Sequence, residues 1–292
     1  MPRLRLTSVR APVIFAVLML GSIFSGDAYA AEGYPKRIIS LAPSITEELY
    51  LLKVESSLVG NTTYCVTPPP ARHKEKIGAI TKVDLEKIVG LKPDLVLATS
   101  LTNPKTIQKL MDIGIEVKVF PAPKSFKSLC EQFLELGKAV GKEADAREIV
   151  TAAEKEVEAI KAGTAALDKP KVFIEIGTKP LFTANRDYFI NDFVELGGGT
   201  NIAGNSKIGT YSREEVLRQN ADVILIVTMG ITGEKEKEAW KKLDTLNAVK
   251  HGRIYVVDSR KICSPTPVTF VETLKEITAL LHPELELPGG GI

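Results

Sequence analysis

Motifs that mark the common enzyme classes are missing from this sequence. It contains no G-x-S-x-G nucleophile elbow, no HExxH zinc motif, no phosphate-binding P-loop and no glycine fingerprint of a dinucleotide-binding fold. Its three histidines, His73, His251 and His282, lie too far apart to give a metal-ligand spacing. We therefore expect a protein that is not an enzyme and that holds no resident metal or cofactor.

An excess of charge of either sign is also missing. The chain has 38 Lys and Arg against 36 Asp and Glu, and no basic block stands out, which argues against a nucleic-acid-binding face. Cysteine is scarce and odd in number, so the three thiols cannot all pair within one chain. Cys130 falls in an apolar helical pattern, and we expect it to be buried as a small hydrophobic side chain.

A long apolar run stands near the N-terminus. Three arginines precede the run of residues 11–24, and an A-x-A pattern ends at Ala30. The run is shorter than the roughly 20 residues that a membrane span needs. We predict a secretory signal peptide over residues 1–30, cut after Ala30, and a periplasmic protein; a retained membrane anchor is the alternative. No cysteine near the cut offers a lipid-attachment site.

The rest of the chain alternates apolar runs with helical patterns, which is typical of an α/β protein with parallel strands. We expect strands at 37–41, 58–61, 94–98, 116–120, 171–176, 222–227 and 253–257. We expect helices at 44–52, 84–91, 103–113, 125–167, 187–196, 212–220, 235–243 and 267–281. Ser44 and Glu47 have the spacing of a capping box for the first helix. Gly137 and Gly141 suggest a break in the longest one, whose second piece runs over residues 142–166.

This order predicts two Rossmann-like α/β lobes joined by one long α-helix, with a ligand cleft between the lobes. The expected parts are an N-terminal lobe at 36–124, a helical segment at 125–168, a C-terminal lobe at 169–284 and a flexible tail at 285–292. Glycines 197–199 follow a helix rather than a strand, so a helix C-terminus fits them better than a phosphate loop.

One pattern occurs twice, as DLEKIVGLKPDLVLATS at 84–100 and SREEVLRQNADVILIVT at 212–228. Each copy is a short helix that leads into a buried strand, and each has a glutamate in third place, Glu86 and Glu214. The two glutamates therefore take equivalent places in the two halves. A negative charge in the first turn of a helix favours the helix dipole, so the pattern alone leaves a local role and a recognition role open.

Five stretches together resemble a known family. They are RIISLAPSITEEL (37–49), LEKIVGLKPDLVLA (85–98), VFIEIGTKPLFTANRDYFINDFVELGGGTNI (172–202), YSREEVLRQNADVILI (211–226) and CSPTP (263–267). The chain resembles the helix-linked periplasmic substrate-binding proteins of ABC importers for cobalamin, ferric siderophores and haem, and the cobalamin-binding member most. The resemblance implies a monomer that captures a corrinoid or another metal chelate and delivers it to an ABC permease and its ATPase at the inner membrane. Glu86 and Glu214 match the family's glutamates that dock onto permease arginines.

Candidate cleft residues follow strands, because ligands of open α/β sheets bind outside the carboxyl ends of the strands. They are Pro43, Ser44, Tyr64, Cys65, Ile80, Phe182, Arg260 and Cys263. Tyr64 and Phe182 offer flat faces to a macrocycle, and Arg260 suits a carboxylate or phosphate.

The two loop cysteines, Cys65 and Cys263, allow a more specific hypothesis about the cleft. We expect both to face the cleft, where they would ligate a metal, close a disulfide or stand as unrelated small residues. We also expect Cys263 to have a lowered thiol pKa, because it precedes a helix N-terminus.

Two departures from the resemblance leave the ligand open. Aromatic residues of cobalamin binders are not matched at Ile80 and Lys261, and Cys65-Val66-Thr67-Pro68 stands in place of an Asp-Tyr-Pro loop. A ferric-siderophore or haem carrier, with Tyr64 as a haem ligand, is the first alternative. An exported enzyme on a related scaffold is the second.

Overall fold

Short runs of aliphatic residues form two parallel sheets in the computed structural model, which describes residues 33–207, 209–228 and 233–285. In the described residues the first sheet has the strand order β3-β2-β1-β6-β7. Its strands are β1 (Ile38–Ser40), β2 (Leu58–Asn61), β3 (Glu75–Lys76), β6 (Leu95–Thr99) and β7 (Val117–Phe120). The central strands β1 and β6 are buried on both faces, which explains why they read as continuous apolar runs.

The second sheet repeats the topology of the first. Its described strands have the order β11-β8-β12-β13, and all of their pairings are parallel. They are β8 (Lys171–Glu175), β11 (Thr200–Asn201), β12 (Val223–Thr228) and β13 (Ile254–Asp258). β8 lies between β11 and β12 as β1 lies between β2 and β6, so each lobe is built on the same plan. The expected two-lobe α/β fold is confirmed.

Two small hairpins, which the sequence pattern did not predict, accompany these sheets. They are β4 (Gly78–Ala79) with β5 (Lys82–Val83), and β9 (Gly177–Thr178) with β10 (Leu181–Phe182). A 3₁₀ turn at Pro69–His73 and the short helices α9 (Asn247–Lys250) and α10 (Ser259–Cys263) were missed as well. Each of these elements is too short to show a period.

The helices of the first lobe are α1 (Pro43–Leu51), α2 (Leu85–Gly90) and α3 (Pro104–Asp112). The predicted capping box of α1 is wrong. The N-cap is Ala42, which makes no side-chain hydrogen bond, and Pro43 occupies the first helical position. The fixed backbone of proline suits that position and starts the helix without a polar cap. The Ser44 hydroxyl is therefore not used for capping.

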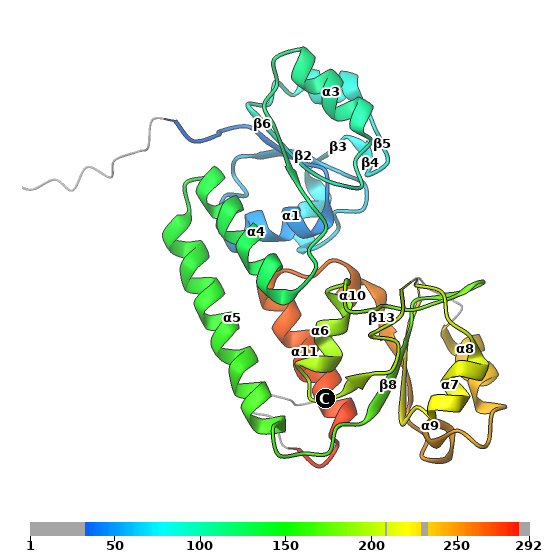
Figure 1. Cartoon of the computed structure of the whole chain (residues 1–292). Coiled ribbons are helices and arrows are strands. Elements are labelled where there is room, and N and C mark those ends of the chain that lie inside the picture. Colours follow the sequence, from blue (N-terminus) through cyan, green and yellow to red (C-terminus); the bar gives the residue numbers. More distant parts are fainter. Residues whose placement is uncertain (1–32, 208, 229–232, 286–292) are drawn as a thin grey trace, which may run out of the picture. The chain divides into compact units, whose positions relative to one another are not determined.

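A pair of long helices connects the two lobes. α4 (Phe126–Ala139) and α5 (Glu143–Thr164) pack against each other, and α5 also runs beside α11 (Pro267–Leu281) (Figure 1). The 22 residues of α5 span about 33 Å. The break lies at Gly141, whose φ of 71° favours glycine. Gly137, expected to share in the break, is instead helical, and a Cβ there would come within 2.5 Å of the Cβ of Ala146.

The missing side chain at Gly137 allows the close approach of α4 and α5. We expect Gly137→Ala to lower the free energy of unfolding by about 1–3 kcal/mol, because the added methyl group overfills the contact. Gly163→Ala is the matched control: Gly163 also lies in a helix, but a Cβ there would meet no described atom outside its own helix backbone within 4 Å. That change should raise stability by up to about 1 kcal/mol through helix propensity. Urea unfolding of both variants checks the pair, and equal effects would contradict the packing role.

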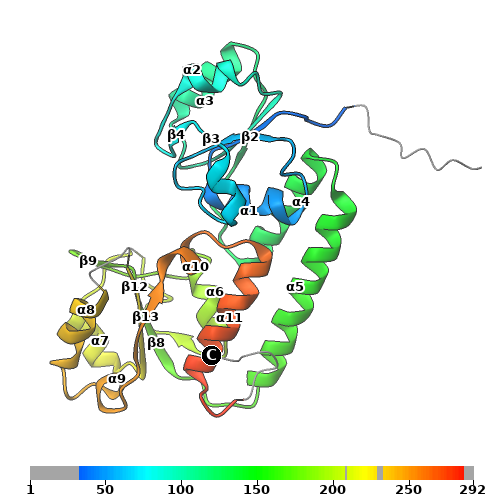
Figure 2. The same cartoon turned by 180° about the vertical axis from the view of Figure 1, so that it is seen from behind.

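One apolar core extends through both lobes. It joins Ile38 and Leu97 of the first sheet to Val172 and Leu225 of the second through the inner faces of α4, α5 and α11. Both lobes belong to one compact unit that begins at Tyr34. Seen from behind in Figure 2, α11 lies between α5 and the second sheet. As predicted, Cys130 is buried in this core. The remaining helices are α6 (Ile190–Glu195), α7 (Arg213–Gln219) and α8 (Gly233–Lys241).

Some predictions fall outside the described residues. These are the signal peptide at 1–30 with its cut after Ala30, and all but the first residue of the tail at 285–292. Among the residues that are described, no helix is both long and apolar enough to cross a membrane. Gly198, with a φ of 85°, follows α6, so the glycine run does end a helix.

Candidate functional site

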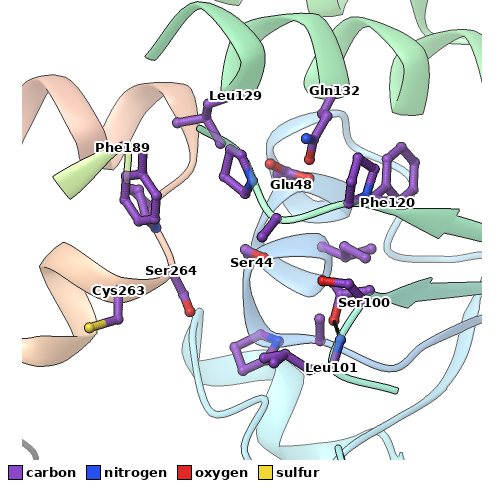
Figure 3. A pocket seen from close by; sticks show the side chains of 18 of the residues that line it. Ser44, Glu48, Ser100, Leu101, Phe120, Leu129, Gln132, Phe189, Cys263 and Ser264 are labelled. Atoms are coloured by element: carbon purple, nitrogen blue, oxygen red, sulfur yellow. Dashed lines mark hydrogen bonds between the residues drawn. The ribbon is translucent and has the colours of Figure 1, made fainter. Parts of the chain in front are cut away.

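Loops at the carboxyl ends of β1, β6 and β7 enclose a pocket of about 180 Å³ (Figure 3). The first lobe contributes the start of α1, the turn of the β4–β5 hairpin and the segments after β6 and β7, together with one face of α4. The second lobe contributes Phe189, which precedes α6, and residues 263–265, which are the last residue of α10 and the two that follow it. The pocket therefore lies between the lobes, where the sheet topology predicts a ligand.

The lining is mostly apolar and carries no basic side chain. Its walls include Ile80, Leu101, Phe120 and Phe189 along with four prolines. The polar groups are neutral or acidic: Ser44, Glu48, Thr99, Ser100, Gln132 and Ser264. No Lys, Arg or His is among the described residues that line the pocket. A ligand seated here meets hydrogen-bonding groups and apolar surface, but no cation.

Glu48 is the site residue that the sequence analysis missed. It lies on the buried face of α1 and lines the pocket, with only 7% of its surface exposed. Burial, followed by the negative charge of Glu47, raises the pKa of Glu48 to about 8. Its place three residues after Ile45 and four before Leu52 was the available signal, since that spacing marks the apolar side of a helix.

Four of the eight predicted cleft residues line the pocket, namely Pro43, Ser44, Ile80 and Cys263. Tyr64 lies outside the lining and is 61% exposed. Phe182 belongs to the β9–β10 hairpin, where its ring covers Gly209 so closely that no side chain would fit there.

Arg260 is the remaining predicted cleft residue that carries a charge. It is exposed outside the lining and donates to Asp258 at 2.8 Å. The hydrogen bond to Asp258, together with its charge, raises the pKa of Arg260. That Tyr64, Phe182 and Arg260 contact the ligand remains a prediction.

The two loop cysteines do not share the pocket. Cys65 is fully buried with its sulfur 3.1 Å from the Thr62 hydroxyl, so the expectation that it faces the cleft is wrong. Cys263 ends α10, and three residues separate it from α11, whose N-cap is Thr266. Although the Cys263 side chain is exposed, desolvation of its sulfur and then the charge of Asp258 raise its pKa, so the expected lowering is also wrong.

Within the described residues, these thiols form neither a disulfide nor a metal-binding cluster. All three cysteines are free, and the described residues contain no group of three or more His, Cys, Asp or Glu that would hold a metal ion. His282 is buried, and its Nε2 has no hydrogen-bond partner among the described residues.

The twice-occurring pattern forms two equivalent helix starts. Asp84 accepts a hydrogen bond from the backbone of Lys87 at the start of α2, and Ser212 accepts one from Glu215 at the start of α7, both at 3.1 Å. Glu86 and Glu214 are each the second residue of their helix, and both are exposed.

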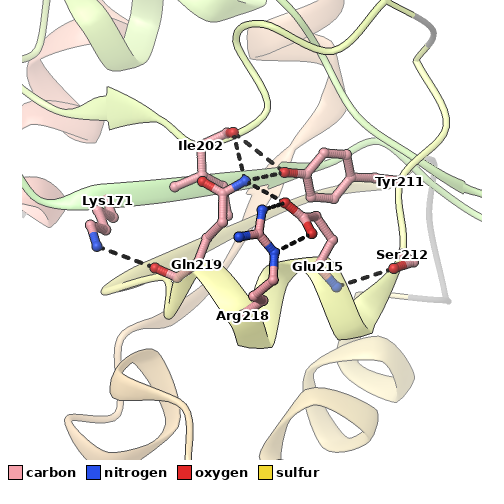
Figure 4. Close-up of polar contacts among 7 residues, drawn as sticks. All are labelled: Lys171, Ile202, Tyr211, Ser212, Glu215, Arg218 and Gln219. Carbon is pink, nitrogen blue, oxygen red and sulfur yellow. Dashed lines mark hydrogen bonds and ion pairs between the residues drawn. The ribbon is translucent and has the colours of Figure 1, made fainter.

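The neighbouring carboxylate of α7, Glu215, forms an ion pair with Arg218, whereas Glu214 forms none with the described residues. Figure 4 shows Glu215 accepting hydrogen bonds from Arg218 and Gln219. Within the described part of the chain, neither Glu86 nor Glu214 forms an ion pair. The backbone at the helix start, and then the Ser212 hydroxyl, lower the pKa of Glu214, which keeps it ionised. Each lobe thus presents one unpaired carboxylate at the same local position.

Residues 38–261 match the family described as periplasmic binding protein. The chain belongs to this family. It is 31% identical to an uncharacterised ABC transporter substrate-binding lipoprotein of Bacillus subtilis over 86% of this chain and 81% of the relative. It is 32% identical to a vitamin B12-binding protein of Pectobacterium atrosepticum over 73% of this chain and 77% of the relative. As a member, it is a substrate-binding protein of the ABC transporter type.

A solved structure agrees with this assignment. A possible iron-binding, periplasmic solute-binding protein of Staphylococcus epidermidis superposes with a TM-score of 0.76 at 29% identity, covering 85% of this chain and 99% of the other. The resemblance stated from the sequence motifs is therefore confirmed at the level of family and fold.

Proposed function

We propose that this protein captures a corrinoid between its lobes and delivers it to an ABC permease. The observation that carries the choice of ligand is the pocket lining, which offers apolar walls and neutral hydrogen-bonding groups without a basic residue. The corrin ring of cobalamin is edged by neutral amides, whereas haem and many ferric siderophores present anionic groups. The similarity to a vitamin B12-binding protein supports the same ligand class.

The enclosed pocket is large enough for only part of a corrinoid. Its volume of about 180 Å³ is below the 300–1,000 Å³ of ordinary ligand pockets. A macrocycle would insert one edge beside Ser44 and Ser100 and extend beyond the enclosed space. Exposed Tyr64 would then be available to cover its outer face.

Calorimetric titration of the chain from Ala31 onward tests the ligand. We expect one-to-one binding of cyanocobalamin with a Kd of about 1 μM or tighter, and recovery of the ligand unchanged, as suits a carrier rather than an enzyme. Ferric hydroxamate siderophore and haemin serve as parallel ligands. Binding of an iron chelate alone would move the function to iron acquisition, which the likeness to a possible iron-binding protein keeps as the second candidate.

Export and partners belong to the same proposal. We infer cleavage after Ala30 and action as a monomer in the periplasm, with the permease and its ATPase as partners. The Bacillus relative is named a lipoprotein, but the first cysteine of this chain is Cys65, well inside the first lobe. N-terminal sequencing of protein from a periplasmic extract should begin at Ala31.

A further inference from the structure

The inner wall of the pocket carries a carboxyl group that no described residue neutralises. Glu48 is more than nine-tenths buried and lines the pocket. Figure 3 shows its carboxyl near the side-chain amide of Gln132. The Glu48 side chain makes no hydrogen bond or ion pair with another described residue, and its oxygens are not among the fully enclosed unpartnered atoms, so they reach the pocket space. Since buried polar groups are almost always partnered, this carboxyl is available to a ligand.

The electrostatic surroundings of Glu48 favour its protonated form. Glu47, on the same helix, adds a negative charge, and burial is the larger effect. From α4, the Cys130 thiol lies within electrostatic reach, and its pKa is raised to about 12 by burial and then by Glu154, Glu131 and Glu48. No cation lines the pocket among the described residues. A protonated carboxyl has one O–H donor as well as an acceptor oxygen.

We propose that Glu48 is a specificity-determining residue, whose carboxyl donates a hydrogen bond to a neutral oxygen acceptor of the ligand and whose surroundings reject a carboxylate there. The inference rests on the proposed corrinoid function, because a peripheral amide supplies such an acceptor. The side chains of Gln132 and Ser44 line the same pocket, and they can form the remaining hydrogen bonds of the ligand amide.

Rejection of carboxylates follows from the lack of a counterion. If a ligand carboxylate entered beside Glu48, the two acids would share one proton and leave at least one negative charge in the buried space. An unpaired buried charge is costly, and nothing in the lining compensates it. Haem propionates and anionic siderophores would suffer this penalty, whereas a corrinoid amide would not.

The affinity for cyanocobalamin, measured as a function of pH, tests whether the Glu48 carboxyl acts as a hydrogen-bond donor. Cyanocobalamin is uncharged and does not titrate between pH 6 and 9.5, so any change reports the protein. In the wild-type mature protein, affinity should stay constant up to about pH 7 and fall about tenfold by pH 9.5, as Glu48 loses its proton. Glu48→Gln keeps a donor that cannot ionise, so its affinity should match the wild type at pH 6.5 and remain flat.

Three further variants separate the donor role from a structural role. Glu48→Leu should bind about fivefold more weakly than the wild type at pH 6.5, because the donor is lost, and its affinity should not change with pH. Glu47→Gln removes one cause of the raised pKa and should shift the midpoint of the profile to lower pH. Glu148→Gln, at an exposed position of α5 outside the pocket lining, should reproduce the wild-type profile. A flat wild-type profile, or one that Glu48→Gln retains, overturns the inference.

Failure of the corrinoid proposal can be distinguished from failure of the inference about Glu48. If cyanocobalamin does not bind at any pH, that proposal falls, and Glu48 is judged by carboxyl-carbon NMR of protein labelled with [¹³C]glutamate. A resonance that titrates near pH 8 and disappears in Glu48→Gln supports a neutral donor in the pocket. Titration of Glu48 near the ordinary value of 4.5 overturns it.

Discussion

Reversing both Glu86 and Glu214 to lysine is expected to lower ligand uptake at least tenfold while leaving ligand affinity unchanged. The two carboxylates occupy the second residue of equivalent helices in the two lobes, and both are exposed without an ion pair in the described residues. Charge complementarity fixes the register of an interface, and like charges placed opposite each other cost several kcal/mol. A permease that presents two arginines related by a two-fold axis would be repelled at both contacts.

The measurement is uptake of labelled ligand by cells in which this chain alone serves the importer. Glu116→Lys with Glu148→Lys is the matched control, since both are exposed, neither is ion-paired with a described residue and the change in net charge is the same. Calorimetry on each variant checks that the ligand site is intact. Transport at the wild-type rate by the Glu86 and Glu214 double variant would refute docking through these residues. Equal loss in the control would point to net charge instead.

Most of the fold could be predicted because its signals are local. Strands such as β6 and β12 are continuous apolar runs that parallel sheets require, and the duplicated pattern revealed two similar lobes. Where the prediction failed, several local rules competed. Ser44 and Glu47 satisfy the capping-box spacing, but Pro43 starts the helix one residue earlier. Gly137 resembles a helix breaker, although it serves the contact between α4 and α5.

The candidate site was harder to predict because pockets are formed by tertiary contacts. The rule that ligands bind after strands identified Pro43, Ser44 and Ile80, which do line the pocket. The same rule selected Cys65, which follows β2 but turns into the lobe interior. Glu48 was missed, because a helical glutamate is ordinarily solvent-exposed and the pocket that it lines is completed by α4, far along the chain.

A cluster of aromatic rings links the connecting helices to the pocket wall. The Phe270 ring of α11 lies with its centroid 4.7 Å from that of Phe126 on α4 and 4.3 Å from that of Phe193 on α6. Phe193 in turn contacts Phe189, which lines the pocket, with ring centroids 6.4 Å apart. Phe270 is fully buried, so it holds α4, α11 and α6 together at the junction of the lobes.

Phe270→Ala is expected to lower the free energy of unfolding by about 3–5 kcal/mol, because it leaves a cavity and removes two aromatic contacts. Since native proteins have only about 5–15 kcal/mol of stability, this is a large share. Phe270→Leu refills most of the space and should lose less than half as much. Val119→Ala, at a site 41% exposed, should stay within about 0.5 kcal/mol of the wild type. Urea unfolding measures all three variants, and a loss below about 1 kcal/mol in Phe270→Ala would show that the ring cluster does not hold the lobes together.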